Sequence, residues 1–275
     1  MAIQTPGRKR GTTCETGHED SSMKTDIAIL RHTFGLIFSN PWQTLVVTAP
    51  GTLTFVAAFL LFGRLVFSDA AMQSSSFFSL ALLLQFVATI FASILIAVMW
   101  HRYALLQGDD RALIMRPKPS AFGRYFFATI FIVLIVLPLY LAVGFIIGST
   151  TTALLDPFAQ GRLGAGIAIG LILTLLISWI LIRIGLILPA IAINARLSMI
   201  DSWKATASVS FVLIRVILII AVLNILLNMA LVQFVWAMPM TGIAVQVLLS
   251  FFQILVTLSL LSTLYGYLVE KRELA

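Results

Sequence analysis

Two arginines inside apolar stretches are the residues whose chemistry stands out first in this sequence. Arg183 lies about six residues inside one apolar run, and Arg215 lies about nine residues inside the next run along the chain. An arginine at the centre of a bilayer costs about 2.5–3.5 kcal/mol on insertion scales, and less where its long side chain reaches the headgroups. Two interpretations stay open: two separate arginines whose side chains extend to the headgroup region, or part of an anion pocket.

The anion-pocket interpretation includes two further arginines just outside the apolar runs. Arg102 ends an earlier run on the same predicted side of the membrane, and Arg196 follows the run that contains Arg183. No acidic residue lies within an apolar run, and Asp201 is the acid closest in sequence. Guanidinium groups bind phosphate oxygens through paired hydrogen bonds. The pattern predicts a site for an anionic lipid headgroup at Arg102, Arg183, Arg196 and Arg215.

The groups that other chemistries require are missing from the apolar runs. All eleven carboxylates fall in tails, loops or the edges of the runs, which disfavours proton or cation transport through buried acids. The histidines at positions 18, 32 and 101 have no metal-ligand spacing, and no grouping of serine or cysteine with histidine predicts a nucleophile. We expect no metal, no cofactor and no catalytic residue, and enzymatic activity is the least favoured function class.

Polar side chains recur at helical spacing on three of the apolar runs. The stripes consist of Gln85, Thr89 and Ser93, of Asn224 and Asn228, and of Gln246 and Gln253. In lipid such groups seek partners on neighbouring helices, at about 0.6–2 kcal/mol per hydrogen bond. The stripes therefore predict helix–helix contacts, with a hydrated substrate path as the second interpretation.

Two glycine pairs predict a close contact between the third and fourth apolar runs. Gly144 and Gly148 lie near the end of the third run, and Gly166 and Gly170 lie near the start of the fourth. Glycines four residues apart share one side of a helix and let two backbones approach closely. We expect the two runs to pack tightly at these glycines.

The elements that position these residues are six long apolar segments. Sixty per cent of the 275 residues are hydrophobic and 11% are charged, against about 25% charged residues in soluble domains. About twenty helical residues, each rising about 1.5 Å, cross the hydrocarbon core of a bilayer. Six segments reach that length: residues 42–67, 77–100, 124–147, 163–189, 206–234 and 242–268. The predicted fold is an all-α, polytopic bundle of transmembrane helices.

The basic residues between the apolar segments predict the orientation of the chain. Fourteen of the 18 Lys and Arg residues fall in the two termini and the second and fourth loops, and two fall on the opposite side. Because positively charged loops stay in the cytoplasm, both ends of the chain are expected there. Topology and anionic headgroups also account for the net charge of +7, so we expect no nucleic-acid partner.

Two shorter segments are predicted to be helices at the cytoplasmic interface. The first covers residues 24–39 and carries apolar residues at helical spacing on one face and polar residues on the other. Its apolar face comprises Ile27, Leu30, Phe34, Ile37 and Phe38, and its polar face comprises Asp26, Arg31 and His32. The second covers residues 198–207 and opens with Ser198 and Asp201, a spacing that resembles a capping box.

The N-terminal stretch sets the domain organisation. Residues 1–23 are polar, contain a basic cluster without a following apolar core, and are expected to form a disordered cytoplasmic tail. Residues 24–275 then form a single six-span transmembrane domain.

Short motifs at the ends of the apolar runs resemble those of a known group of membrane proteins. The segment Arg183–Ile219 has an arginine near the end of a span, followed by the motifs LPAIA (188–192) and SMIDSW (198–203). Trp100-His101-Arg102 ends the second span and Asn40-Pro41 opens the first. Over most of residues 24–268 the chain resembles bacterial six-span proteins of the YciC-like family and the membrane domain associated with glycerophosphodiester phosphodiesterases.

The resemblance implies a location in the cytoplasmic (inner) membrane and no established activity. No soluble phosphodiesterase domain accompanies these residues, so that catalysis is not carried over. Our leading hypothesis is a non-enzymatic membrane protein that binds anionic lipid or a membrane partner. The alternative is a transporter or flippase of an amphiphilic or anionic molecule, and a membrane enzyme acting on lipids ranks third.

Overall fold

The computed structural model describes residues 16–63, 65, 75–107, 114–152, 160–237 and 239–274. Residues 1–15 of the expected tail lie outside the described residues. The described chain is built from helices, six of which are long and apolar enough to cross a membrane. The predicted all-α bundle of six spans is confirmed, and the protein is a multi-pass integral membrane protein.

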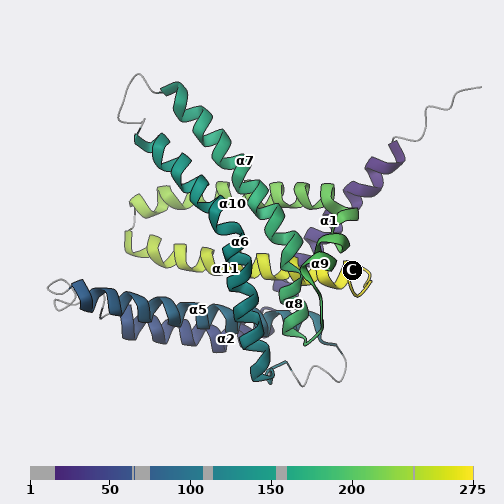
Figure 1. The fold of residues 1–275 in the computed structure, drawn as a ribbon, viewed down its shortest axis with the longest axis horizontal. Helices are drawn as coiled ribbons and strands as arrows, with labels where there is room; N and C mark the ends of the chain where they lie inside the picture. Colours follow the sequence, from purple (N-terminus) through teal and green to yellow (C-terminus); the bar gives the residue numbers. More distant parts are fainter. Residues whose placement is uncertain are drawn as a thin grey trace, which may run out of the picture.

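Three helical hairpins make up the spanning part of the molecule. They are α2 (Pro41–Ala58) with α5 (Ser75–Leu105), α6 (Pro119–Thr152) with α7 (Gln160–Gly185), and α10 (Ser210–Ala237) with α11 (Pro239–Leu268). Shorter elements join or extend them: α1 (Thr16–Phe38), the π-helical η1 (Phe59–Gly63), α8 (Ile187–Ala192), α9 (Met199–Ala205) and the 3-10 turn η5 (Ala207–Val209). In Figure 1 the α6–α7 hairpin leaves the other two at a steep angle, and α1, α8, α9 and the C-terminus lie on one side of the molecule.

The two ends of the bundle differ in packing. At one end, here called the packed end, most side chains are buried; it comprises residues 94–105, 177–192, 209–217 and 255–268. At the other, here called the open end, most side chains are exposed; it comprises residues 76–93, 127–146, 168–176, 218–232 and 245–254. The exposed side chains of the open end are almost all apolar, as a surface in contact with lipid requires.

The first helix, α1, packs under the last hairpin at the packed end. It begins at Thr16, eight residues before the predicted start at residue 24. The buried side of α1 consists of Asp26, Ile29, Thr33 and Ile37, whereas Ile27 and Phe38 of the predicted apolar face are exposed.

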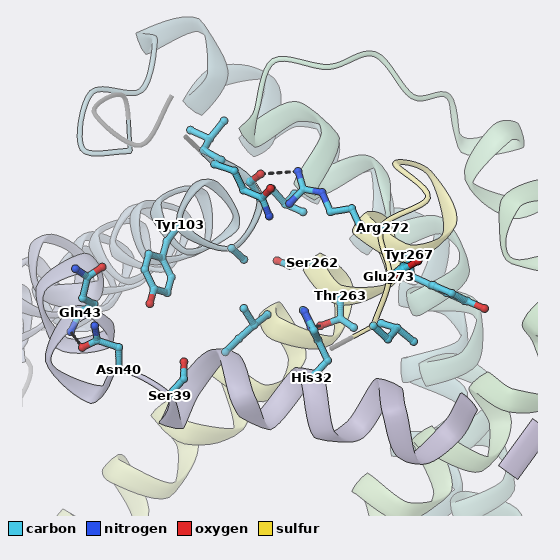
Figure 2. A pocket seen from close by; sticks show the side chains of 17 residues that line it. His32, Ser39, Asn40, Gln43, Tyr103, Ser262, Thr263, Tyr267, Arg272 and Glu273 are labelled. Carbon is cyan, nitrogen blue, oxygen red and sulfur yellow. Dashed lines mark hydrogen bonds between the residues drawn. The ribbon is translucent and has the colours of Figure 1, made fainter. Parts of the chain in front are cut away.

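A cavity remains where α1 meets the ends of α5 and α11. We call this cavity of about 560 Å³ the interfacial pocket; its walls include His32, Tyr103, Thr263 and Arg272 (Figure 2). Asn40 and Pro41 fix the sharp turn from α1 into α2 beside it. The Asn40 side chain accepts a hydrogen bond from the Gln43 amide at 3.2 Å, and a proline at the first helical position needs no amide partner.

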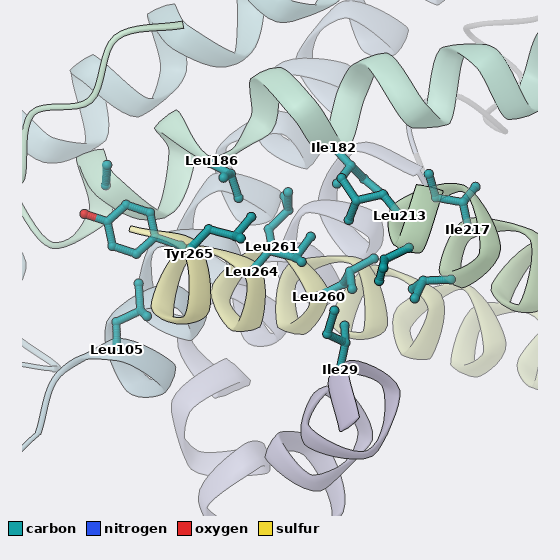
Figure 3. Close-up of a cluster of buried hydrophobic side chains, with 14 residues drawn as sticks. Ile29, Leu105, Ile182, Leu186, Leu213, Ile217, Leu260, Leu261, Leu264 and Tyr265 are labelled. Carbon is teal, nitrogen blue, oxygen red and sulfur yellow. The ribbon is translucent and has the colours of Figure 1, made fainter. Parts of the chain in front are cut away.

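A large apolar core surrounds α11, the most buried of the six spans (Figure 3). Leu260, Leu261 and Leu264 of α11 contact Ile29 of α1, Leu213 and Ile217 of α10, and Ile182 and Leu186 at the end of α7. Leu264, Leu213, Leu186 and Ile29 are fully buried. The last span is therefore the centre that holds α1, α7 and α10 together.

The close helix approach at a glycine occurs in α2 and not in the predicted pair. A Cβ at Gly51 would collide with the Ile96 side chain and lie 2.8 Å from the Ala92 carbonyl oxygen of α5. Among the described residues, a Cβ at Gly144 or Gly148 would meet no atom within 4 Å. Helices α6 and α7 do pack, through Val136, Val143 and Ile177, so the two spans form the predicted pair, while no described residue lies close to Gly144 or Gly148.

The remaining two glycines of the prediction lie on α7. Gly170 is buried, and Gly166 falls in the part of α7 whose side chains lie outside the described residues. Successive helical residues are rotated by about 100°, so Gly144 is turned by about 80–100° from Val136 and Val143, the residues that meet α7. The aliphatic side chains therefore decide how this hairpin packs.

Candidate functional site

Arg102 is buried and its charge is directed at the end of a short helix. Its Nη1 donates to the carbonyl of Ala192, the last residue of α8, at 2.9 Å, and its Nε donates to the carbonyl of Ile114 at 3.4 Å. Carbonyl groups at a helix C-terminus lack intrahelical partners and carry partial negative charge. Arg102 therefore caps α8 and ties it to α5.

The helix that Arg102 caps exists because a proline interrupts α7. Pro189 has no N–H to donate to the carbonyl four residues earlier, and α7 ends there, at Gly185. Asn194 follows α8 with a positive φ of 62°, a conformation that asparagine tolerates at helix ends. Its side-chain oxygen accepts a hydrogen bond from Arg124 of α6 at 2.7 Å, which fixes the turn between the second and third hairpins.

Arg215 forms an ion pair with Asp26 of α1. Its Nη2 donates to Oδ1 at 3.2 Å and its Nε donates to Oδ2 of the same carboxylate. The Asp26 side chain is 6% exposed and that of Arg215 is 44% exposed. No acid lies within a predicted span, but α1 packs against α10 and brings a carboxylate to Arg215 from 189 positions away in the sequence.

Arg183 lies between two indole rings at the junction of α7 and α9. Its Cζ is 3.8 Å from the ring centroid of Trp203 and 4.9 Å from that of Trp179. Its Nη2 donates to the Trp203 carbonyl at 2.7 Å and its Nε to the Thr206 hydroxyl at 3.0 Å. Each cation–π contact contributes about 0.5–2 kcal/mol, so the side chain is held firmly in place.

The charge of Arg183 has no acidic partner in the part of the chain that the structure describes. The residue is only 6% exposed, and a buried charge is costly unless an opposite charge or strong hydrogen bonds accompany it. Two of its three nitrogens donate to protein oxygens, and within the described residues Nη1 has no such acceptor. Within the described residues, Arg183 is therefore a buried guanidinium without a carboxylate partner.

An apolar groove of about 360 Å³ adjoins Arg183 between α7 and α10. Five aliphatic residues and Trp179 form its walls: Leu175, Leu176, Ile214, Ile217 and Leu218 with the indole. The indole Nε1 of Trp179 is buried and meets no acceptor among the described residues. A groove with this composition accepts an alkyl chain, and its indole N–H offers one hydrogen bond to a polar atom near Arg183.

The four predicted arginines do not form one cluster. Arg102 caps α8, Arg215 pairs with α1 and Arg183 lies between two indoles, so each guanidinium has a different set of partners. Arg196 is exposed in the turn between α8 and α9. The sequence identified Arg183 correctly as an unusual charge but gave no sign of the Trp179 and Trp203 rings around it.

The polar stripes bond mainly along their own helices. Gln85 Nε2 donates to Thr89 at 3.3 Å, and Asn228 donates to the Asn224 carbonyl at 2.7 Å. The predicted partners on neighbouring helices are instead found at the packed end. There the Trp100 indole donates to Ser259 at 3.0 Å, and His101 Nδ1 shares a hydrogen bond with Ser262 at 2.8 Å.

Comparison with known proteins finds no family model, curated protein or solved structure that matches this chain. The resemblance to YciC-like membrane proteins stays a prediction.

Proposed function

We propose that this membrane protein binds an anionic phospholipid at the junction of α7, α9 and α10. The acyl chain occupies the apolar groove, and the phosphate lies against Arg183 and the Trp179 N–H. The observation that carries the proposal is the buried Arg183 guanidinium, which has no carboxylate partner in the described chain and lies beside a groove lined by aliphatic side chains.

Polar and apolar residues follow one another from α9 inward along α7 in the same order as the headgroup, phosphate and acyl chain of a lipid. Trp203 and Lys204 of α9 lie near the end of the span, Arg183 follows, and Trp179 and Leu175 lie one and two helical turns further in. A phosphate at the headgroup level is then beside the guanidinium while the chain runs inward along α7 and α10. Tryptophan at this level is typical of the membrane interface.

The charge of the site favours an anionic over a neutral headgroup. A phosphate neutralises the guanidinium and accepts from both Nη1 and the Trp179 indole, and hydrogen bonds to charged groups contribute about 1.5–3 kcal/mol each. Burial of each methylene adds about 0.8 kcal/mol relative to water, although a lipid already in the bilayer gains little from this term. Selectivity therefore comes mainly from the headgroup.

By the positive-inside rule, we infer that the packed end of the bundle faces the cytoplasm. The anionic lipid at Arg183 then belongs to the cytoplasmic leaflet. The packed end carries the chain ends and the loops with most of the lysines and arginines. Six spans leave both ends of the chain on the same side. We propose that the protein is a non-enzymatic component of that leaflet whose packing, or whose contact with a membrane partner, depends on the bound lipid.

Native mass spectrometry of protein released directly from membranes tests the proposal. The wild type is expected to retain about one anionic phospholipid, and Arg183→Gln is expected to lose it. A double substitution, Asp26→Asn with Arg215→Gln, removes a guanidinium together with its own carboxylate and serves as the matched control that keeps the lipid. Retention of the same lipid by Arg183→Gln would refute the proposal.

A second variant separates lipid loss from misfolding. Leu218→Trp fills the groove without changing any charge, and it is expected to displace the lipid while the guanidinium keeps its protein contacts. Trp179→Phe removes the indole N–H and leaves a smaller aromatic ring in the groove wall, and it is expected to weaken retention. Thermal unfolding in detergent shows that each variant is folded before its lipids are identified.

Movement of lipid across the bilayer is the second candidate function, and one observation favours it. Gln85 Oε1 is buried in the open end and has no hydrogen-bond partner among the described residues. Neither described cavity includes Gln85, Asn224 or Gln253, so binding ranks ahead of transport. Liposomes that contain the protein and a fluorescent phospholipid test this candidate. If the protein moves lipid, labelled lipid that starts in the inner leaflet should be bleached faster from outside, and Gln85→Leu should abolish this acceleration.

A further inference from the structure

The interfacial pocket is separate from the α7–α10 groove and is lined mainly by polar groups. Its walls come from α1, the start of α2, the ends of α5 and α11, and the C-terminal segment (Figure 2). These are the positions at which the first, second and sixth spans end, so the pocket lies at the depth of the lipid headgroups. A volume of about 560 Å³ is in the range of sites for small molecules.

The C-terminal segment closes one side of the pocket and brings a cation into it. Arg272 donates through Nη2 to the Leu105 carbonyl at 2.7 Å and pairs with Glu270 at 2.6 Å. Its amide also donates to the Gly266 carbonyl at 2.9 Å, which folds the segment back over the end of α11. The guanidinium is thereby fixed at the wall of the cavity.

Hydrogen-bond donors face the cavity from the other walls. His32 points into it from α1, with its Nδ1 bonded to Thr263 at 3.1 Å, and Tyr103 projects from the end of α5 (Figure 2). Tyr267 and Asn40 also line the cavity. A guanidinium, a phenol, an amide and an imidazole lie around one space, together with the Glu273 carboxylate, and the four donors are groups that bind the oxygens of a phosphate.

We propose that the interfacial pocket binds a small polar molecule through a phosphate group, with Arg272 as its main cationic contact. The phosphate belongs either to a soluble metabolite or to a lipid headgroup, and the chemistry of recognition is the same for both. The site is independent of the lipid proposed at Arg183, because it shares none of the residues around that side chain.

Binding is coupled to the protonation of His32. Burial and the charge of Arg272 lower the pKa of His32 below its usual 6.5, so the empty pocket holds a neutral imidazole at neutral pH. The groups that face it are Arg272 and Glu273 of the C-terminal segment and Tyr103 and Tyr267 of α5 and α11. A bound phosphate offsets the positive charge of Arg272 and favours the protonated ring, so affinity rises as the pH falls through the titration of His32.

The test uses full-length protein in nanodiscs of neutral phosphatidylcholine, titrated with inorganic phosphate and followed by phosphorus NMR line broadening. Phosphate is expected to bind the wild type, and Arg272→Gln is expected to weaken binding by about tenfold or more. Lys271→Asn is the matched control, because it removes the neighbouring exposed charge and suits the positive φ of 59° there. Arg183→Gln is expected to leave phosphate binding unchanged.

A second arm identifies the source of the phosphate. If inorganic phosphate does not bind but nanodiscs containing phosphatidylglycerol raise the unfolding temperature in a way that needs Arg272, the ligand is a lipid headgroup and the proposal stands. Tyr103→Phe keeps the ring and removes the hydroxyl, so it is expected to weaken binding even if Arg272→Gln disturbs folding. Equal behaviour of the wild type, Arg272→Gln and Tyr103→Phe in both arms would overturn the proposal.

Discussion

The packed end and the open end of this bundle are made from the same six helices but are held together differently. At the packed end, polar side chains cross between helices: Trp100 to Ser259, His101 to Ser262 and Arg102 to the end of α8. At the open end, Gln85, Thr89 and Asn228 bond to their own helices. The difference shows that interhelical hydrogen bonds are concentrated where the hairpins meet.

The physical reason lies in the solvent that each end faces. Lipid is as apolar as leucine, so burying aliphatic surface between helices adds little stability inside the bilayer. Close van der Waals packing and hydrogen bonds that lipid does not offer must hold the helices together. The packed end has both, and the hairpins of the open end are free to separate around lipid.

The largest expected effect comes from the closest helix contact. Gly51→Leu should lower the stability of the fold by about 3 kcal/mol or more, because its side chain meets Ile96 and the Ala92 carbonyl of α5. Thermal unfolding in detergent measures the effect. Gly144→Leu is the matched control in the open end, where the added carbon meets no atom of the described residues within 4 Å, and its unfolding temperature should match the wild type. Equal losses in both variants would show that the contact between α2 and α5 at Gly51 is no closer than the surroundings of Gly144.

Removal of one hydroxyl distinguishes interhelical bonds from bonds within one helix. Ser262→Ala should cost about 1–3 kcal/mol, because it leaves His101 Nδ1 unpaired while His101 Nε2 already has no partner among the described residues. Ser93→Ala removes a hydroxyl that bonds the Thr89 carbonyl of its own helix, and it should be nearly neutral. Denaturant titration of the two variants in the same detergent gives both values.

Breaking the ion pair between α1 and α10 should lower the stability of the fold by less than the two changes above. Asp26→Asn should cost about 1 kcal/mol, since Asp26 is buried but Arg215 is partly exposed to solvent. The double variant with Arg215→Gln should recover part of that loss, because no unpaired charge remains. A double-mutant cycle measured by thermal unfolding reports the coupling energy between Asp26 and Arg215. A coupling energy of zero would show that this ion pair does not stabilise the packing of α1 at the packed end.

The smallest effect is expected from pH. The pKa of His32 is lowered in the folded protein by burial and by Arg272, so the unfolded chain binds the proton more readily. The stability that the neutral imidazole contributes is complete above its ordinary pKa of about 6.5 and is lost as the pH falls below that value. His32→Gln should flatten this part of the stability profile. If the slope of stability against pH were the same in His32→Gln as in the wild type, the protonation of His32 would not affect the packing of α1.

The spans could be predicted from the sequence, whereas most contacts between them could not. Apolar length is a local property, so all six segments and the turn at Asn40-Pro41 were accessible. The partner of Arg215 was not, because Asp26 lies on another helix 189 residues away. Its position on the polar face of α1 indicated solvent, and no local pattern distinguishes an acid in water from one under a bundle.

The glycine contact failed for a related reason. The spacing of Gly144 and Gly148 shows that they share one face of a helix, but it carries no information on which face meets the neighbour. Gly51 has no glycine four residues away, yet α2 and α5 approach each other so closely there that an added Cβ would collide with Ile96. The Ser198–Asp201 cap was predictable because both groups lie within one turn, and the Asp201 amide does donate to Ser198 at 3.1 Å.

The position of α1 against α10 and α11 has a consequence for how the chain folds in the membrane. This helix leaves the ribosome before any of the six spans described above, but its neighbours Leu213, Leu260 and Leu264 and its counter-ion Arg215 belong to the last two of them. Until those two spans are made, the apolar side of α1 has only the membrane surface to contact, as an amphipathic helix in the headgroup layer does. A chain cut before α10 would therefore keep α1 on the lipid surface.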